Sequence, residues 1–141
     1  MTPVEILLVE DNPGDVRLLA EALKEVRVPA RLHVAEDGIK AMGFLTGGNP
    51  RPDLILLDLN LPRKDGREVL AEIKGDPGLK SIPVIVFTTS QAEQDVLHSY
   101  ELHANCFISK PVGLENYIRV IRSIDSFWLK TVRLPGTERR T

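Results

Sequence analysis

The fold is decided by one stretch of nine residues, Leu54-Ile55-Leu56-Leu57-Asp58-Leu59-Asn60-Leu61-Pro62. Four aliphatic residues are followed by the carboxylate of Asp58, and Pro62 ends the run. A short apolar run with such boundaries predicts a strand that is buried on both faces, as in a parallel sheet. Parallel sheets bind their ligands beyond the carboxyl ends of their strands. We therefore expect Asp58 to lie at the functional edge of the sheet.

The composition is that of an ordinary globular domain. The chain has 141 residues, of which 43% are hydrophobic and 27% charged, and its net charge is -2. This length fits one domain, and the charge balance gives no case for binding nucleic acid or an anionic membrane. No apolar run approaches the roughly 20 residues of a membrane span. The single cysteine, Cys106, is interpreted as a core residue in a reducing cytosol, so we predict a cytoplasmic protein.

Apolar runs and helical repeats alternate five times along the chain. We expect strands over 4–9, 32–35, 54–57, 83–88 and 105–108. We expect helices over 13–26, 37–45, 65–75, 91–102 and 114–129. Such alternation predicts an α/β fold, with a five-stranded parallel sheet and helices on both faces.

Four of these strands end on polar residues, namely Glu10-Asp11, Asp58, Thr88 and Lys110. The carboxyl ends of parallel strands share one edge, so these side chains should converge. Three carboxylates in one crevice repel each other unless a cation intervenes, and all-oxygen ligands suit Mg²⁺. Lys110 offers a positive charge to an anion, and Thr88 offers a hydroxyl donor. These are the parts needed to move a phosphoryl group onto Asp58 as an acyl phosphate.

Each of these residues also has an ordinary explanation when it is taken alone. An acidic pair can begin a helix, a lysine is usually solvated, and a threonine often ends a strand. Their joint placement at four strand ends favours a site.

Five motifs together resemble the receiver domain of two-component response regulators, along nearly the whole chain. They are Leu8-Val9-Glu10-Asp11-Asn12, Leu56-Leu57-Asp58-Leu59-Asn60-Leu61-Pro62, Asp65-Gly66, Phe87-Thr88-Thr89-Ser90 and Ser109-Lys110-Pro111. The spacings of 30 residues from Asp58 to Thr88 and of 52 from Asp58 to Lys110 are also similar to those of the family. The resemblance implies a flavodoxin-like, doubly wound sheet with strand order 2-1-3-4-5 and five helices.

By this resemblance Asp58 is the phosphoacceptor, and it acts with Lys110 in catalysis. Asp11, Asp58 and the main-chain carbonyl of Asn60 are expected to bind Mg²⁺ directly, and Glu10 through water.

The resemblance also assigns the residues that hold the phosphoryl group and respond to it. Thr88 is expected to hydrogen-bond this group, with Thr89 in the same switch segment, and Lys110 to pair with it. The Lys110-Pro111 bond is expected to be cis. Phe107 takes the place of the switch aromatic, and because it has no hydroxyl its rotation must be driven by packing alone.

Three stretches are similar to the stand-alone regulators that serve phytochrome-type sensor histidine kinases. They are Val9-Glu10-Asp11-Asn12-Pro13-Gly14-Asp15, the run from Asn60 to Leu70, and Phe127-Trp128-Leu129. The expected phosphoryl donor is therefore a phosphohistidine on a sensor histidine kinase.

The domain prediction is a receiver over 1–129, followed by a short C-terminal extension over 130–141 without an output domain. Output must then occur through protein contact. The last helix has an expected core stripe of Leu114, Ile118 and Ile121, and further apolar residues at Tyr117, Val120, Ile124 and Phe127. This apolar surface exceeds what one sheet face needs, so we predict a homodimer through this helix and the C-terminal segment. The alternative is that residues 131–135 fold back and cover the helix.

Two other functions compete with this interpretation. A phosphatase of the haloacid-dehalogenase type also uses a strand-end aspartate, but it needs a second aspartate where this chain has Asn60. A receiver-like scaffold that never carries phosphate would not need the complete set of polar residues found here. We do not expect an enzyme in the usual sense, because the chemistry is limited to self-catalysed phosphorylation and hydrolysis.

Overall fold

The computed structural model describes residues 3–90 and 92–135, and it contains the predicted five-stranded parallel sheet. The strand order is β2-β1-β3-β4-β5, which confirms the expected flavodoxin-like topology. The strands are β1 (Val4–Val9), β2 (Ala30–Ala35), β3 (Leu54–Leu57), β4 (Val84–Thr88) and β5 (Cys106–Ser109).

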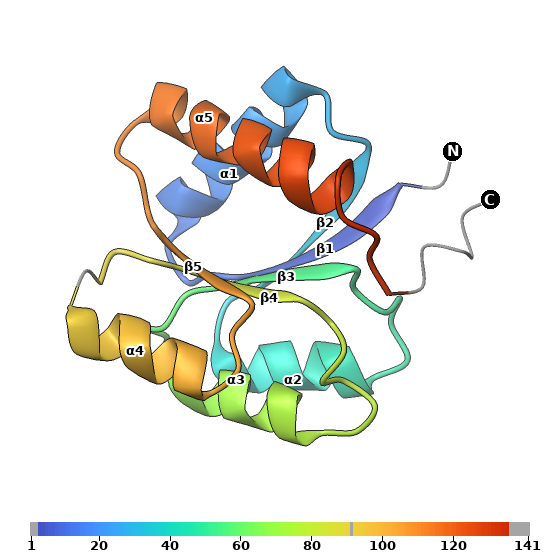
Figure 1. Cartoon of the computed structure of the whole chain (residues 1–141), viewed down its shortest axis with the longest axis vertical. Helices are drawn as coiled ribbons and strands as arrows, with labels where there is room; N and C mark the ends of the chain where they lie inside the picture. The colour runs from blue at the N-terminus through green and yellow to red at the C-terminus, as the bar shows by residue number, and fades with distance from the viewer. Residues whose placement is uncertain (1–2, 91, 136–141) are drawn as a thin grey trace.

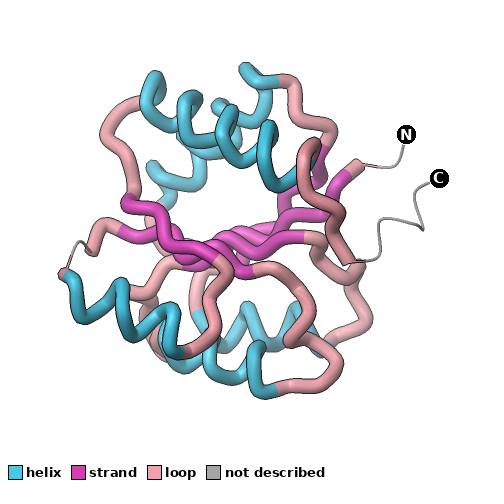
Figure 2. Tube along the Cα trace, in the orientation of Figure 1, coloured by secondary structure: helices cyan, strands magenta, loops and turns pink. Residues whose placement is uncertain are grey.

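Five helices cover the two faces of this sheet. They are α1 (Pro13–Val26), α2 (Gly38–Thr46), α3 (Gly66–Gly75), α4 (Glu93–Glu101) and α5 (Leu114–Ile124), the last continued by a π-helical turn, η1 (Asp125–Leu129). Helices α1 and α5 lie on one face, and α2, α3 and α4 lie on the other (Figure 1). Figure 2 shows the resulting three layers, with the strands between two layers of helices. Among the described residues, no helix has the length and apolar character that a membrane span requires.

Strand β3 is the centre of the core. Each of its four residues is at most 1% exposed. Leu54 and Leu56 pack in the cluster beneath α1 and α5, and Ile55 and Leu57 in the cluster on the opposite face, because successive side chains of a strand alternate. Burying each such side chain contributes about 1.5–3 kcal/mol. The next residue, Asp58, is therefore held firmly at the carboxyl end of a buried strand.

Only three residues separate the end of β1 at Val9 from the start of α1 at Pro13, because the sequence places a helix cap there. The Asn12 side-chain oxygen accepts hydrogen bonds from the backbone N–H groups of Gly14 at 2.8 Å and of Asp15 at 3.1 Å. Pro13 occupies the first helical position, where its missing N–H costs nothing. This tight connection keeps the first turn of α1 beside the end of β1.

Helix α3 returns close to the end of β3 because a glycine allows the approach. The Gly66 N–H donates to the Leu59 carbonyl at 2.9 Å. A Cβ at Gly66 would lie 2.1 Å from the main-chain oxygen of Asp58, which is far too close. The Asp65 side chain caps the helix through the Arg67 N–H at 2.9 Å. The segment after Asp58 is thus packed against a helix rather than left as a free loop.

The expected starts of two elements, β2 and α4, differ from the structure by two residues, and the other starts agree within one residue. Strand β2 begins at Ala30 rather than at residue 32, because Ala30 pairs with Val4 at the start of β1. Helix α4 is described from Glu93, and the expected start at residue 91 lies outside the described residues. Residues 1–2 and 136–141, at the two ends of the predicted domain and extension, also lie outside them.

The expected core stripe of the last helix is wrong at Leu114, which is 38% exposed. The residues of α5 that are buried, at 4% exposure or less, are Tyr117, Ile121 and Ile124. Their spacing is helical, and the packing of α5 against α1 sets which side of the helix faces the sheet.

The described part of the C-terminal segment lies partly against the body of the domain. Leu134 is only 4% exposed, as expected if residues 131–135 fold back. Phe127 of η1 is nevertheless 53% exposed, so the segment does not cover all of the apolar surface at this end of the helix.

Candidate functional site

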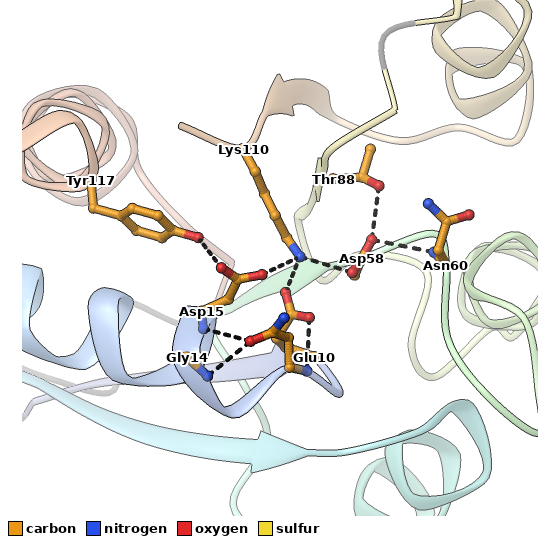
Figure 3. A network of polar contacts seen from close by, with 9 residues as sticks. Glu10, Gly14, Asp15, Asp58, Asn60, Thr88, Lys110 and Tyr117 are labelled. Carbon is orange, nitrogen blue, oxygen red and sulfur yellow. Dashed lines mark hydrogen bonds and ion pairs between the residues drawn. The ribbon is translucent and has the colours of Figure 1, made fainter. Parts of the chain in front are cut away.

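The polar residues predicted at the strand ends do converge at the carboxyl edge of the sheet (Figure 3). Glu10 follows β1, Asp58 follows β3, Thr88 ends β4, and Lys110 follows β5. Glu10 is 2% exposed, Asp58 is 5% exposed and Thr88 is fully buried. Glu10, Asp58 and Thr88 are therefore largely shielded from water, so each of their polar contacts matters more than it would in water.

Both carboxylate oxygens of Asp58 accept hydrogen bonds. Its Oδ1 accepts from the Thr88 hydroxyl at 2.8 Å and from the Asn60 N–H at 3.2 Å. Its Oδ2 accepts from the Lys110 ammonium at 2.9 Å. The side chain is thus held by a hydroxyl, a backbone amide and a positive charge, which are the donors that a transferred anionic group also needs.

The Lys110 ammonium lies at the centre of the cluster. Besides Asp58, it contacts Glu10 Oε1 at 2.5 Å and Asp15 Oδ2 at 3.0 Å. Its side chain is 5% exposed. Burial alone would lower the pKa of Lys110, but hydrogen bonds to Glu10, Asp58 and Asp15 outweigh burial and raise it. The lysine side chain therefore stays charged. The backbone N–H of Lys110 donates to the Thr88 carbonyl at 2.8 Å, which fixes the backbone at this position.

Three carboxylates of the site lie close enough together to hold a cation. Oxygens of Glu10, Asp11 and Asp58 lie within 4.8 Å of one another. Burial and the nearby charge of Asp58 raise the pKa of Glu10 to about 7, although Lys110 opposes this shift. One ammonium does not neutralise this many acids, so a divalent cation with oxygen ligands fits the donor set.

Comparison with known proteins identifies the family. A family model described as the response regulator receiver domain matches residues 6–122. The chain belongs to the response regulator receiver domain family. This receiver is a signalling protein. Membership of the receiver family does not favour the phosphatase or the scaffold as an alternative function.

The receiver has relatives over nearly its whole length. It is 54% identical over 139 residues to the response regulator Rcp1 of Synechocystis sp., with 95% of each chain covered. It is also similar to the crystal structure of the Mn²⁺-bound form of Rcp1, at 53% identity and TM-score 0.88, covering 95% of this chain and 100% of that one. The phosphorylated cyanobacterial phytochrome response regulator RcpA is similar at 51% identity and TM-score 0.90, covering 96% and 100%. The receiver is thus related to the phytochrome response regulators.

The expected switch residues lie in different surroundings. Thr88 is in the polar cluster, whereas the neighbouring Thr89 is exposed. Phe107 is half-buried and packs against the core, outside the cluster. Its N–H donates to the Tyr100 hydroxyl at 3.2 Å, so a tyrosine hydroxyl does lie beside the aromatic position, although it comes from α4.

The expected cis bond between Lys110 and Pro111 is wrong, because no peptide bond of residues 3–90 and 92–135 is cis. Trans is the lower-energy form of most X–Pro bonds. In this form Lys110 already reaches its three carboxylates, so the observed contacts do not require the minority isomer.

Two residues of the cluster were not predicted. Asp15 contacts Lys110 with one oxygen, and its other oxygen accepts a hydrogen bond from the Tyr117 hydroxyl at 3.2 Å. Tyr117 is 1% exposed, and burial together with Asp15 raises its pKa. In the sequence Asp15 is explained as an acid in the first turn of a helix, and Tyr117 as part of an apolar surface. Neither has a local signal for a contact with a residue so distant in the chain.

Proposed function

We propose that this receiver accepts a phosphoryl group on Asp58 from a phosphohistidine of a sensor histidine kinase, and that the kinase is of the phytochrome type. The observation that carries the proposal is the position of Asp58, a buried carboxylate between the Lys110 ammonium at 2.9 Å and the Thr88 hydroxyl at 2.8 Å. The similarity to RcpA, whose phosphorylated form is known, supports both the chemistry and the kind of kinase.

In the proposed reaction a carboxylate oxygen of Asp58 attacks the phosphorus of the donor. The new O–P bond forms as the N–P bond breaks, and the histidine nitrogen leaves with the electron pair. Lys110 offsets the charge of the incoming group, and the Thr88 hydroxyl turns from the carboxylate to a phosphoryl oxygen. In hydrolysis, the oxygen of a water molecule bonds to phosphorus as the Asp58 O–P bond breaks, which releases phosphate. Both steps are self-catalysed, with Asp58 and Lys110 as the catalytic residues.

We assign the cation of the site as Mg²⁺. Glu10, Asp11 and Asp58, with the main-chain carbonyl of Asn60, would hold it. The donor set supports this assignment, as does the Mn²⁺ bound to the related Rcp1. The cation supplies positive charge that offsets both the carboxylates and the phosphoryl oxygens.

Phosphorylation then acts on a balance between two conformers. A phosphoryl group carries about two negative charges, which attract Lys110 and Thr88. Thr89 moves with this strand end, and Phe107 repacks beneath it. A full shift from 1:99 to 99:1 needs about 5.5 kcal/mol, so one phosphoryl group with its hydrogen bonds shifts the population only in part.

Output in this proposal occurs through a homodimer formed by α5 and the C-terminal segment. In this proposal, residues 1–129 form the receiver and residues 130–141 form a short C-terminal extension. The protein acts in the cytoplasm. The exposure of Phe127, at 53%, supports an interface at this end of the helix. Light scattering at tens of micromolar should give the mass of a dimer, and Phe127→Asp should give a monomer. A monomeric mass for the unchanged protein would exclude the homodimer.

Labelling with acetyl phosphate and Mg²⁺ tests the phosphoacceptor. We expect one base-labile phosphoryl group on the protein, and none after Asp58→Asn or with a chelator. Asp53→Asn is the matched control, because it removes a carboxylate from the residue that precedes the same strand. Equal labelling of the Asp58→Asn variant would contradict the proposal.

A further inference from the structure

A chain of polar contacts leads from the phosphoacceptor to the last helix (Figure 3). Asp58 contacts Lys110 at 2.9 Å, Lys110 contacts Asp15 at 3.0 Å, and Asp15 contacts the Tyr117 hydroxyl at 3.2 Å. The chain links the ends of β3 and β5 with α1 and α5. The family assignment gives no role to its last two members.

The ammonium of Lys110 has no donor to spare. It carries three N–H groups, and three carboxylates lie within 3.0 Å of its nitrogen. A phosphoryl group on Asp58 brings further acceptor oxygens to the same ammonium. Lys110 can bind them well only if it gives up one of its present partners.

Of the three carboxylates that contact Lys110, Asp15 is the one that is not a proposed metal ligand. A phosphoryl group on Asp58 opposes its charge directly. Asp15 and Asp58 contact the same nitrogen atom, at 3.0 and 2.9 Å, so their oxygens are close neighbours. A phosphoryl group with about two negative charges at Asp58 therefore repels the Asp15 carboxylate. The Asp15 side chain is 26% exposed, so it has a path towards water.

Tyr117 connects this displacement to the last helix. Its ring is buried and packs edge-on against Phe87 of β4, with ring centroids 5.8 Å apart. If Asp15 moves, the Tyr117 hydroxyl loses its partner in a site that excludes water, and such a loss is costly. The Tyr117 side chain must then shift to find another partner, and because Tyr117 belongs to α5, this shift acts on the helix.

We propose that Asp15, held by Tyr117, is a positioning residue for Lys110, and that a phosphoryl group on Asp58 displaces Asp15 and so acts on α5 through Tyr117. This inference rests on the proposed role of Asp58. Coupling between two sites is reciprocal. Weakening the contact between Asp15 and Tyr117 must therefore favour binding of a phosphoryl group, or of its mimic, at Asp58.

The test measures binding of beryllium fluoride, a phosphoryl mimic, in the presence of Mg²⁺ by titration calorimetry. Asp15→Asn and Tyr117→Phe should each bind the mimic about five-fold more tightly than the unchanged protein. The double variant should also gain about five-fold, whereas independent effects would multiply to about 25-fold. Glu21→Gln is the control. It removes an exposed carboxylate from α1, the helix that also contains Asp15, and it should leave the affinity for the mimic unchanged.

The single tryptophan, Trp128, reports on the last helix, because it lies in η1 directly after α5. Its fluorescence should change when the mimic binds to the unchanged protein, and this change should shrink in Tyr117→Phe. A residue with only a structural role would lower thermal stability without tightening the binding of an anion. If Tyr117→Phe does not fold, Asp15→Asn still tests the displacement.

Failure of this inference is distinct from failure of the proposed function. If the unchanged protein does not bind the mimic, both are overturned. If it binds, and Asp58→Asn does not, the role of Asp58 stands. Unchanged or weaker affinity in Asp15→Asn would then overturn the displacement of Asp15 alone. If binding of the mimic does not alter the Trp128 fluorescence of the protein without substitutions, the proposed action on α5 is overturned.

Discussion

Replacing Lys110 with methionine tests how the site is held together. The change keeps most of the side-chain volume and removes the charge that lies 2.5 Å from Glu10, 3.0 Å from Asp15 and 2.9 Å from Asp58. The side chains of Glu10 and Asp58 are 2% and 6% exposed, so water cannot replace the ammonium there.

The expected loss of stability follows from this burial. Removing one partner of a buried ion pair costs about 3–5 kcal/mol, because the other charge stays buried and unpaired. Lys110 lowers the pKa of Glu10, so its removal favours protonation of Glu10, and the loss of stability should be largest near pH 8 and smaller near pH 5. If the proposed Mg²⁺ site forms, Mg²⁺ should restore part of the stability, because the cation would bind these carboxylates when the protein is folded.

Urea unfolding of the two proteins at pH 5 and pH 8, with and without Mg²⁺, measures these differences. Lys24→Met is the control, since Lys24 is 77% exposed and lies 3.8 Å from Glu21, and it should change stability by less than about 0.5 kcal/mol. Equal stability of the Lys110→Met and Lys24→Met variants at pH 8 would refute the view that Lys110 holds the acids together.

Three further predictions concern the surroundings of the site. The folded pKa of Glu10 is raised from 4.5 to about 7, so the folded chain holds a proton that the unfolded chain releases. Without metal, the stability that Glu10 contributes is present below about pH 4.5 and is lost as the pH rises to about 7. Urea unfolding of Glu10→Gln should not show this loss between the two pH values. An equal loss of unfolding free energy in the variant would contradict the raised pKa of Glu10. Gly66→Ala should destabilise by about 1–3 kcal/mol in urea because its Cβ would meet the Asp58 carbonyl, whereas Gly75→Ala, with open space around it, should not; equal stability would disprove the close approach. Asn12→Ala should cost about 1 kcal/mol of unfolding free energy through loss of the α1 cap, and an unchanged value would show that the cap is dispensable.

The fold could be predicted where local chemistry determines it. The apolar runs at 4–9 and 54–57 have the bounds of β1 and β3, and Asn12 with Pro13 fixed the start of α1. The start of β2 could not be predicted, because it depends on pairing with Val4 rather than on its own residues. The side of α5 that faces the sheet depends in the same way on its packing against α1.

The site was predictable to the extent that strand ends define it. Knowing that parallel strands share one carboxyl edge was enough to bring Glu10, Asp58, Thr88 and Lys110 together. Asp15 and Tyr117 were missed because they reach the cluster from helices, across 95 and 102 residues of sequence. Such contacts depend on how the helices pack, and the sequence carries no periodic signal for them.

The most direct test of the account locates the phosphoryl group itself. The protein is treated with acetyl phosphate and Mg²⁺, and the acyl phosphate is reduced with borohydride, which converts a phosphorylated aspartate to homoserine. Peptide mass spectrometry should find homoserine at position 58 and at no other aspartate. Homoserine at position 11 or 15 with an unmodified Asp58, or phosphate retained on a histidine, would contradict the central claim.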